Sequence, residues 1–354
     1  MTDLEKLCSR ITEAADCAVI TDDVNRRYFT AMKSSAGTLV VFPEKAYFII
    51  DFRYIEKAKK TVTACEVILQ DKLYEQINSL IEKHGAKTVS VNADTCTLSE
   101  LIAYQQKLNA EVIADTKLAE IIREIRTVKS QEQIDKIIKA QRIAEKGFAH
   151  MLDFIKVGRT EKEIQLELDY YMLKNGAEAL SFDTIALSGS NTSLPHGVPS
   201  DKKVESGEFV LMDFGANFDG WHSDMTRTVC VGKPSDKMKS VYETVLTAQL
   251  SALDAVKAGM SGKALDKIAR DIITEAGYGD NFGHSLGHGV GVEIHESPYA
   301  SPSREDILPE NSIVTVEPGI YLEGKFGVRI EDFVVVTENG CINMTKAPKE
   351  LICL

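Results

Sequence analysis

Short apolar runs alternate with amphipathic stretches through the first third of the chain. Residues 37–42 and 46–51 are apolar runs on either side of Pro43-Glu44-Lys45, a pattern that predicts a β-hairpin. Residues 1–16 mix charged and apolar positions with the spacing of an amphipathic helix. Strand-like and helix-like segments then alternate along the chain, at 66–69, 74–83, 88–91, 98–107 and 111–113. This alternation predicts a small α/β domain.

The boundary of that domain is expected in a charged helical segment. Residues 118–129 (LAEIIREIRTVK) have a helical pattern, and we place the boundary within them. The assignment gives one domain of residues 1–124 and a second of residues 125–354. The fold class is therefore α/β (α+β), with two domains of unequal size.

Longer helices between blocks of strand are expected in the second domain. An amphipathic helix is predicted from about 130 to 155, and Thr160 with Glu163 has the spacing of a capping box that opens the next helix. Two more helices are predicted at 236–257 and at 263–275, the second ending at Gly277 in a left-handed cap.

Composition limits the classes of function. The chain has 354 residues, of which 44% are apolar, and its net charge is −12, so it lacks the positive footprint of a nucleic-acid-binding protein. The seven cysteines are odd in number, scattered and without a CxxC pair, which is typical of reduced thiols. We see no signal-peptide core and no apolar run long enough to span a membrane. We therefore expect a cytoplasmic protein that contacts neither membrane nor nucleic acid.

Histidines gather in one part of the sequence. Five of the seven lie between His196 and His295, and three of these belong to the glycine-rich segment 284–295 (HSLGHGVGVEIH). Glycines allow a backbone to approach a ligand closely. The segment alone is equally compatible with a glycine-rich turn that contains incidental histidines.

A pair of aspartates favours a ligand. Residues 208–231 predict two strands joined by a turn at Phe218-Asp219, and that turn would place Asp213 directly opposite Asp224, with Cβ atoms about 5 Å apart. Two like charges facing each other destabilise a sheet. A divalent cation between them would offset the repulsion.

Two glutamates repeat the pattern downstream. Glu317 and Glu331 are symmetric about Gly324, so a second hairpin would bring them to facing strands, although Pro318 distorts the ladder and can shift its register by one residue. Any one of these acids alone would be more typical of a solvated strand end. Four carboxylates with one imidazole form a donor set that suits hard or borderline divalent ions.

Four segments of the chain resemble a known superfamily. The strings FGANFDGWHSDMTRT, GHSLGHGVGVEIHE, VEPGIY and GVRIED are similar to the metal-binding blocks of the creatinase/methionine-aminopeptidase superfamily, peptidase family M24, which has the pita-bread fold. The likeness covers essentially all of residues 130–354. The first domain resembles the creatinase-type N-terminal domain of aminopeptidase P and prolidase, which methionine aminopeptidases lack.

The resemblance implies a dinuclear metal centre. Two divalent ions per chain are expected, Mn²⁺ or Co²⁺, with Zn²⁺ as an alternative. Asp213 would bind one ion, Asp224 and Glu331 would bridge both, and His288 with Glu317 would complete the other.

It also implies roles for residues around the metals. Glu317 would shuttle a proton, His196 would contact the scissile amide, and His295 would stabilise the tetrahedral intermediate. His284 and Arg329 would line the pocket for proline and its carboxylate, and Tyr321 would lie near the metals. One departure from the family pattern is Trp221-His222, and His222 is expected either beside the site or on the surface.

The implied activity is hydrolysis of the N-terminal Xaa-Pro bond of short proline-containing peptides by a metal-activated hydroxide. The segment Asp51-Phe-Arg53-Tyr54 resembles short bacterial aminopeptidase P chains, which favours aminopeptidase P over the alternative, an Xaa-Pro dipeptidase (prolidase). Creatinase-like activity without metal and a non-catalytic binding protein on the same fold are remoter alternatives, because all five ligand positions are intact. Relatives with this first domain are usually dimers, so we expect a homodimer in which Asp51 and Arg53 approach the partner's site or pair with each other.

Overall fold

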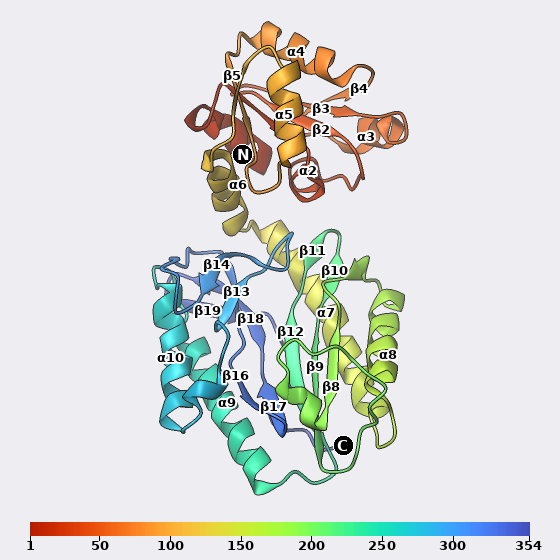
Figure 1. Cartoon of the computed structure of the whole chain (residues 1–354), viewed down its shortest axis with the longest axis vertical. Coiled ribbons are helices and arrows are strands. Elements are labelled where there is room, and N and C mark those ends of the chain that lie inside the picture. The colour runs from red at the N-terminus through yellow and green to blue at the C-terminus, as the bar shows by residue number, and fades with distance from the viewer. The chain divides into compact units, whose positions relative to one another are not determined.

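The computed structural model describes all residues from 1 to 354, and the chain divides into two units, Met1–Arg126 and Thr127–Leu354 (Figure 1). Each unit has its own apolar clusters, two in the first and two in the second. No helix of the structure has both the length and the apolar character that crossing a membrane requires.

A six-stranded mixed sheet forms the centre of the first unit. Its strand order is β4-β3-β2-β1-β5-β6, in which β1 and β3 pair antiparallel with β2 and the other neighbours pair parallel. The strands are β1 Cys17–Ile20, β2 Thr38–Val41, β3 Ala46–Ile50, β4 Glu66–Leu69, β5 Thr88–Val91 and β6 Glu111–Ile113. The helices are α1 Asp3–Arg10, α2 Asp23–Thr30, α3 Ile55–Thr61, α4 Leu73–His84, α5 Leu98–Lys107 and α6 Lys117–Thr127.

Both faces of this sheet are apolar and covered. Successive strand residues point to opposite faces, and accordingly Phe48 packs in one cluster with Leu7 of α1 and Leu118 of α6. Ile49, the next residue, packs in the other cluster with Ile77 of α4. The central strands are thus buried on both sides by helices.

Most of the predicted elements of the first unit are confirmed. The hairpin at residues 37–51 is present as β2 and β3, and the three shorter runs are β4, β5 and β6. The helix expected over residues 1–16 is too long, because α1 ends at Arg10 and a 3₁₀ turn follows to Glu13. The carboxylate of Asp16 accepts the backbone N–H groups of Lys87 and Thr88 at 2.7 and 2.9 Å, which holds this residue at the sheet instead of in a helix.

Helices flank the strands of the second unit on two sides (Figure 1). Helices α7 Gln131–Phe154 and α8 Glu161–Lys174 share a cluster with the sheet of β8 Ile185–Ser188, β9 Glu208–Phe214 and β12 Met225–Val231. Helices α9 Asp236–Ala255 and α10 Gly262–Glu275 share the other with β15 Ile313–Val316 and β18 Asp332–Thr337. The remaining strands are β7 Ala179–Leu180, β10 Ala216–Phe218, β11 Trp221–His222, β13 Gly287–Gly289, β14 Glu296–Ala300, β16 Gly319–Leu322, β17 Phe326–Arg329 and β19 Gly340–Asn343.

The helix signals read from the second domain are confirmed. Thr160 and Glu163 form the predicted capping box at the start of α8. Helix α7 begins with a second capping box between Ser130 and Gln133. Gly277 follows α10 with a positive φ of 84°, as a left-handed cap requires.

The predicted register of the aspartate hairpin is wrong by two residues. The turn lies at Asp219-Gly220, both with positive φ, which is the type I′ geometry that an Asp-Gly pair favours. Asp213 therefore faces Thr226 instead of Asp224. A shift of two residues keeps a side chain on the same face of the strand, so the two carboxylates remain diagonal neighbours.

The predicted register of the glutamate hairpin is confirmed. Gly319 pairs with Arg329 on one side of the glutamates, and Val316 pairs with Asp332 on the other. Both ladders keep the register that places Glu317 opposite Glu331. Pro318 interrupts the ladder between them, as expected, but does not shift it.

Candidate metal centre

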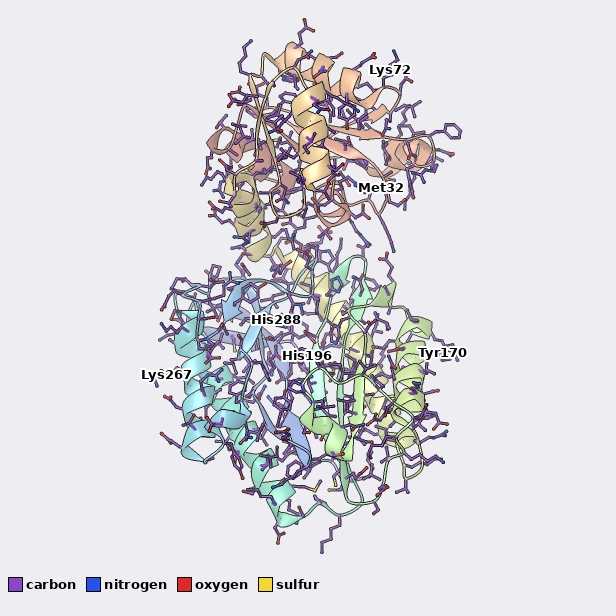
Figure 2. The ribbon with its side chains drawn as sticks, in the orientation of Figure 1. Met32, Lys72, Tyr170, His196, Lys267 and His288 are labelled. Atoms are coloured by element: carbon purple, nitrogen blue, oxygen red, sulfur yellow. The ribbon has the colours of Figure 1, made fainter.

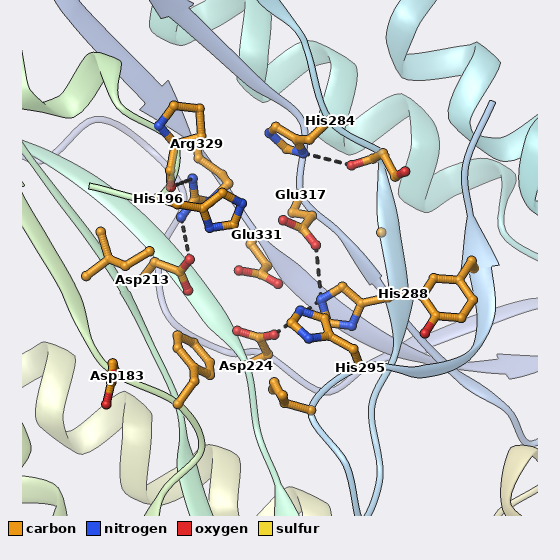
Figure 3. A pocket seen from close by; sticks show the side chains of 17 residues that line it. Asp183, His196, Asp213, Asp224, His284, His288, His295, Glu317, Arg329 and Glu331 are labelled. Carbon is orange, nitrogen blue, oxygen red and sulfur yellow. Dashed lines mark hydrogen bonds and ion pairs between the residues drawn. The ribbon is translucent and has the colours of Figure 1, made fainter. Parts of the chain in front are cut away.

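Nine of the ten residues to which the family resemblance assigns a role at the site line one cavity of about 480 Å³ in the second unit (Figures 2 and 3). They come from strand ends and loops that are far apart in the chain. These residues are His196, Asp213, Asp224, His284, His288, His295, Glu317, Arg329 and Glu331. Tyr321 lies behind the lining and contacts two of these residues.

Three side chains meet closely enough to share one cation. The ligand atoms of Asp224, His288 and Glu331 lie within 4.8 Å of one another, and Figure 3 shows them pointing to the same part of the cavity. Nε2 of His288 is also 3.3 Å from Oε1 of Glu317. The other ring nitrogen of His288, Nδ1, lies 3.0 Å from the carbonyl oxygen of Gly289 and donates to it, because a carbonyl only accepts. Burial acts to lower the pKa of His288, but the contact of Nε2 with Glu317 outweighs it and raises this pKa, so without metal Nε2 donates to the carboxylates. A bound cation would take the place of that proton, as at metal-binding histidines.

The buried carboxylates of this cluster repel one another, so a positive charge between them would stabilise their ionised forms. Burial and the neighbouring carboxylates raise the pKa of Asp224 and of Glu331 well above their ordinary values. Burial acts on Glu317 in the same direction, but contact with His288 and nearby cationic groups lowers its pKa to about 2. Oδ1 of Asp213 and Oε1 of Glu331 are buried without a hydrogen-bond partner. Buried acceptors left unsatisfied are costly, so this donor set fits bound divalent cations.

A chain of hydrogen bonds runs from Asp213 to His284. Arg329 donates to Oδ2 of Asp213 and, from Nη1, to the hydroxyl of Tyr321 at 2.8 Å. Tyr321 lies 2.9 Å from Nε2 of His284, whose Nδ1 is 2.8 Å from the carbonyl oxygen of Ser285. Since arginine only donates and a carbonyl only accepts, Tyr321 donates to Nε2 and His284 is the neutral Nδ1–H tautomer. Burial, which lowers the pKa of His284, favours the same neutral form.

Two threonines that the sequence reasoning missed support the acids. The hydroxyl of Thr226 donates to Glu331 at 2.7 Å and accepts from Nε of Arg329 at 3.0 Å. The hydroxyl of Thr315 donates to Glu317 at 3.0 Å and accepts the backbone N–H of His288 at 2.9 Å. The available signal was their position, since Thr226 and Thr315 each lie two residues from a candidate ligand in a strand and therefore share its face.

His288 and His295 approach each other although their odd spacing would place them on opposite faces of a regular strand. Their ring centroids are 4.3 Å apart, in an edge-to-face arrangement. An irregularity in the strand makes this approach possible, because the pairing of β13 with β14 shifts register between Gly287 and Gly289. Burial and the neighbouring His288 lower the pKa of His295, which favours the neutral imidazole.

The remaining residues named from the sequence lie outside the cavity lining. His222 is half-buried, its ring lies 3.0 Å from the side-chain amide of Asn217, and its backbone N–H donates to Gly291. Asp51 and Arg53 form an ion pair with each other at 2.6 Å within the first unit.

A cluster of acids and one imidazole in a cavity is the kind of arrangement that two-metal hydrolases use. Residues 135–338 match the model of metallopeptidase family M24, and residues 4–128 match that of the creatinase/prolidase N-terminal domain. The chain belongs to metallopeptidase family M24 and is a peptidase. Both the resemblance read from the sequence and the pita-bread fold are thereby confirmed.

The relatives that match nearly the whole chain have names of two kinds, Xaa-Pro dipeptidase and X-Pro aminopeptidase. The chain is 39% identical over 352 residues to an Xaa-Pro dipeptidase of Pyrococcus furiosus, covering 99% of each chain. A solved Xaa-Pro dipeptidase from Bacillus anthracis is 41% identical, with a TM-score of 0.96 over 99% of both chains. A solved X-Pro aminopeptidase from Thermotoga maritima is 38% identical, with a TM-score of 0.91 over 96% of this chain and 98% of that one.

Proposed function

We propose that this peptidase is a metal-dependent Xaa-Pro dipeptidase, which splits dipeptides with a C-terminal proline. The observation that carries the proposal is the meeting of Asp224, His288 and Glu331 within 4.8 Å, in a cavity that Glu317 and Asp213 also line. Divalent ions in cells bind such oxygen and nitrogen donors.

The relatives favour a dipeptidase over the aminopeptidase P that Asp51-Phe-Arg53-Tyr54 had favoured. Xaa-Pro dipeptidases from two sources match almost the whole of both chains at 39% and 41% identity. Aminopeptidase P remains the second candidate, because the X-Pro aminopeptidase of Thermotoga maritima matches nearly as well. The two activities differ only in whether the cavity accepts residues beyond proline.

Five residues would hold two divalent ions. Asp213 would serve one ion, His288 and Glu317 would serve the other, and Asp224 and Glu331 would contribute to both. Bound there, the ions supply Lewis-acid polarisation of the scissile carbonyl and activation of water. The orphaned oxygens of Asp213 and Glu331 support this assignment. Mn²⁺ or Co²⁺ is the expected metal.

The chain's own side chains carry the proton and the developing charge. Glu317, which lines the cavity and is ionised at neutral pH, would accept the proton of the attacking water and pass it to the proline nitrogen. His295 donates a hydrogen bond to the oxygen on which negative charge develops. His196, which lines the same cavity on a separate loop, contacts the scissile amide.

The side of the cavity near Arg329 receives proline. Both ring nitrogens of His284 are engaged, so His284 offers the pyrrolidine ring an aromatic surface instead of a hydrogen bond. Arg329 attracts the substrate carboxylate, and its contacts with Asp213 and Tyr321 keep the guanidinium in place.

Further parts of the proposal concern the whole chain. We assign residues 1–124 to the creatinase-type domain and residues 125–354 to the catalytic domain, and we expect a cytoplasmic homodimer. A sedimentation measurement tests the dimer, and a monomer with full turnover would exclude it.

The activity is tested with a matched pair of substrates. Protein loaded with Mn²⁺ is incubated with Gly-Pro and with Gly-Pro-Ala, and the release of glycine is measured. A dipeptidase releases glycine from Gly-Pro and leaves the tripeptide nearly intact. Faster cleavage of Gly-Pro-Ala would establish the aminopeptidase instead, and cleavage of neither would refute the proposal.

A further inference from the structure

The loop that carries His295 closes on a buried carboxylate. Residues 290–295 join β13 to β14, and Gly289 pairs with Glu296, so the loop begins and ends side by side. The Glu296 residue is 7% exposed, and its Oε2 accepts the backbone N–H of Glu293 at 3.4 Å. The carboxylate therefore contacts the loop from inside.

Lys129 reaches the same carboxylate from the segment that precedes α7. Its Nζ lies 2.6 Å from Oε1 of Glu296 and 3.2 Å from the carbonyl oxygen of Thr127, and its side chain is 0% exposed. The backbone N–H of Lys129 donates to the carbonyl of Asn311 at 3.0 Å. The Lys129 ammonium group is thus fixed by contacts with the backbone of residues near it, and it fixes the Glu296 carboxylate in turn.

Gly291 brings the loop backbone against this ion pair. A Cβ atom at position 291 would lie 2.2 Å from Oε1 of Glu296, so a larger residue would displace the carboxylate. The N–H of Gly291 donates to the carbonyl of Glu293 at 3.0 Å, and its own carbonyl accepts from His222 at 2.9 Å. The backbone of the loop is therefore shaped around one carboxylate.

We propose that the buried Lys129–Glu296 ion pair positions His295, so that Lys129 and Glu296 are positioning residues for the peptidase reaction. The inference rests on the proposed function, in which His295 contacts the developing oxyanion. Buried ion pairs contribute little net stability, because desolvation offsets their attraction. What this pair supplies is geometry, since Glu296 is the direct neighbour of His295 and the loop's two ends meet at it.

Three variants of the full chain test the pair: Lys129→Met, Glu296→Gln and the double variant. With Mn²⁺ and Gly-Pro, each single variant should lower kcat about 10²-fold, the cost of misplacing a catalytic group by about 1 Å. KM and metal content should change little, since His295 acts on the transition state. The double variant should recover at least about tenfold of the kcat lost in Lys129→Met, because it leaves no buried charge unpaired.

Hydrogen exchange of the metal-free protein gives a second readout that needs no activity. The amides of Gly291 and Glu293 should exchange faster in both single variants than in the wild type, because their contacts depend on the anchored carboxylate. Lys267→Met is the matched control, since Lys267 lies exposed on α10 and pairs with Asp271 at 2.6 Å (Figure 2). It should match the wild type in kcat and in exchange.

Two results would overturn the inference. One is a pair of single variants that match the Lys267→Met control in both kcat and exchange. The other is a double variant whose loss of kcat equals the product of the two single losses, which would mean that the residues act independently. If Lys129→Met does not fold, the nearly isosteric Glu296→Gln decides the question by the same readouts. If the wild type cleaves no Xaa-Pro peptide, the proposed function fails, and the exchange comparison alone decides whether the pair anchors the loop.

Discussion

The central strands of the two units carry different side chains. In the first unit, β1 and β3 consist of apolar residues (CAVI and AYFII) that are buried throughout. In the second unit, the buried strand β9 ends with Asp213 and Phe214, and both Glu317 and Glu331 lie at breaks between buried strands. The sheet of the first unit therefore serves only as a hydrophobic core. The strands of the second unit form a hydrophobic core and also carry charged groups at their ends.

The difference identifies which residues serve stability and which serve chemistry. Burying an unpaired charge destabilises a protein, so a chain selected only for stability would not place several carboxylates together. The second unit keeps them, and its Thr226, Thr315 and Arg329 hold them in fixed orientations. We infer that the charges are retained because cations bind between them.

The strongest test of this contrast neutralises a proposed bridging carboxylate. Asp224→Asn and Glu331→Gln should each lower kcat/KM at least about 10³-fold, since each removes several kcal/mol of metal-dependent stabilisation. Circular dichroism should show an unchanged fold. Full activity in either variant would contradict the assignment.

The next effect separates two neighbouring histidines. His295→Ala should lower kcat about 10²–10³-fold, the cost of one oxyanion donor, while metal content stays near that of the wild type. His288→Ala should lose metal and activity together, because its Nε2 belongs to the cluster. Metal titration of both variants checks this. Equally weak binding in the two would move His295 into the set of metal ligands.

The pH dependence of stability gives a smaller effect. The pKa values of Asp224 and Glu331 are raised above the ordinary 3.8 and 4.5, so the folded metal-free protein holds protons that the unfolded chain releases. The contribution of these two groups to the stability of the folded metal-free protein is therefore greatest below pH 3.8. The free energy of unfolding falls as the pH rises through the raised pKa values, by up to about 1.4 kcal/mol per pH unit for each group. Denaturant unfolding should show a flatter pH dependence for Glu331→Gln than for the wild type. A steeper dependence in the variant would contradict the raised pKa.

The smallest effect is expected in the first unit. Ile49→Val removes one methylene group from a residue that is 0% exposed, which should cost about 0.5–1.5 kcal/mol of unfolding free energy. The turnover number for Gly-Pro should not change, because the side chain belongs to a purely apolar cluster. A tenfold loss of kcat with intact metal content would contradict the claim that this side chain of the first unit serves only stability.

Sequence patterns predicted the elements that depend on local physics. The amphipathic pattern located α7, the Thr160–Glu163 capping box located the start of α8, and the symmetry about Gly324 placed Glu317 opposite Glu331. The aspartate hairpin failed because the Asp219-Gly220 turn signal was assigned one residue too early. Helices α2 and α3 were missed because they have eight and seven residues, too short for a clear helical period, and strand β1 was not assigned although it is as apolar as the predicted strands.

The supporting contacts of the site could not be predicted from sequence. Arg329 to Asp213 and Lys129 to Glu296 join residues separated by more than a hundred positions, and no local pattern links them. They exist only because segments that are far apart in the sequence meet in the folded chain. The candidate ligands were visible through their spacing and their resemblance to a family, whereas the residues that orient them became visible in three dimensions.

Counting bound metal tests the central claim most directly. Protein stripped with chelator is titrated with Mn²⁺ by calorimetry, and turnover of Gly-Pro is followed at each addition. The account predicts close to two ions per chain at saturation, no turnover in the stripped protein, and turnover that rises as the sites fill. A stripped protein that retains full activity, or a wild type that binds no more metal than Glu331→Gln, would contradict it.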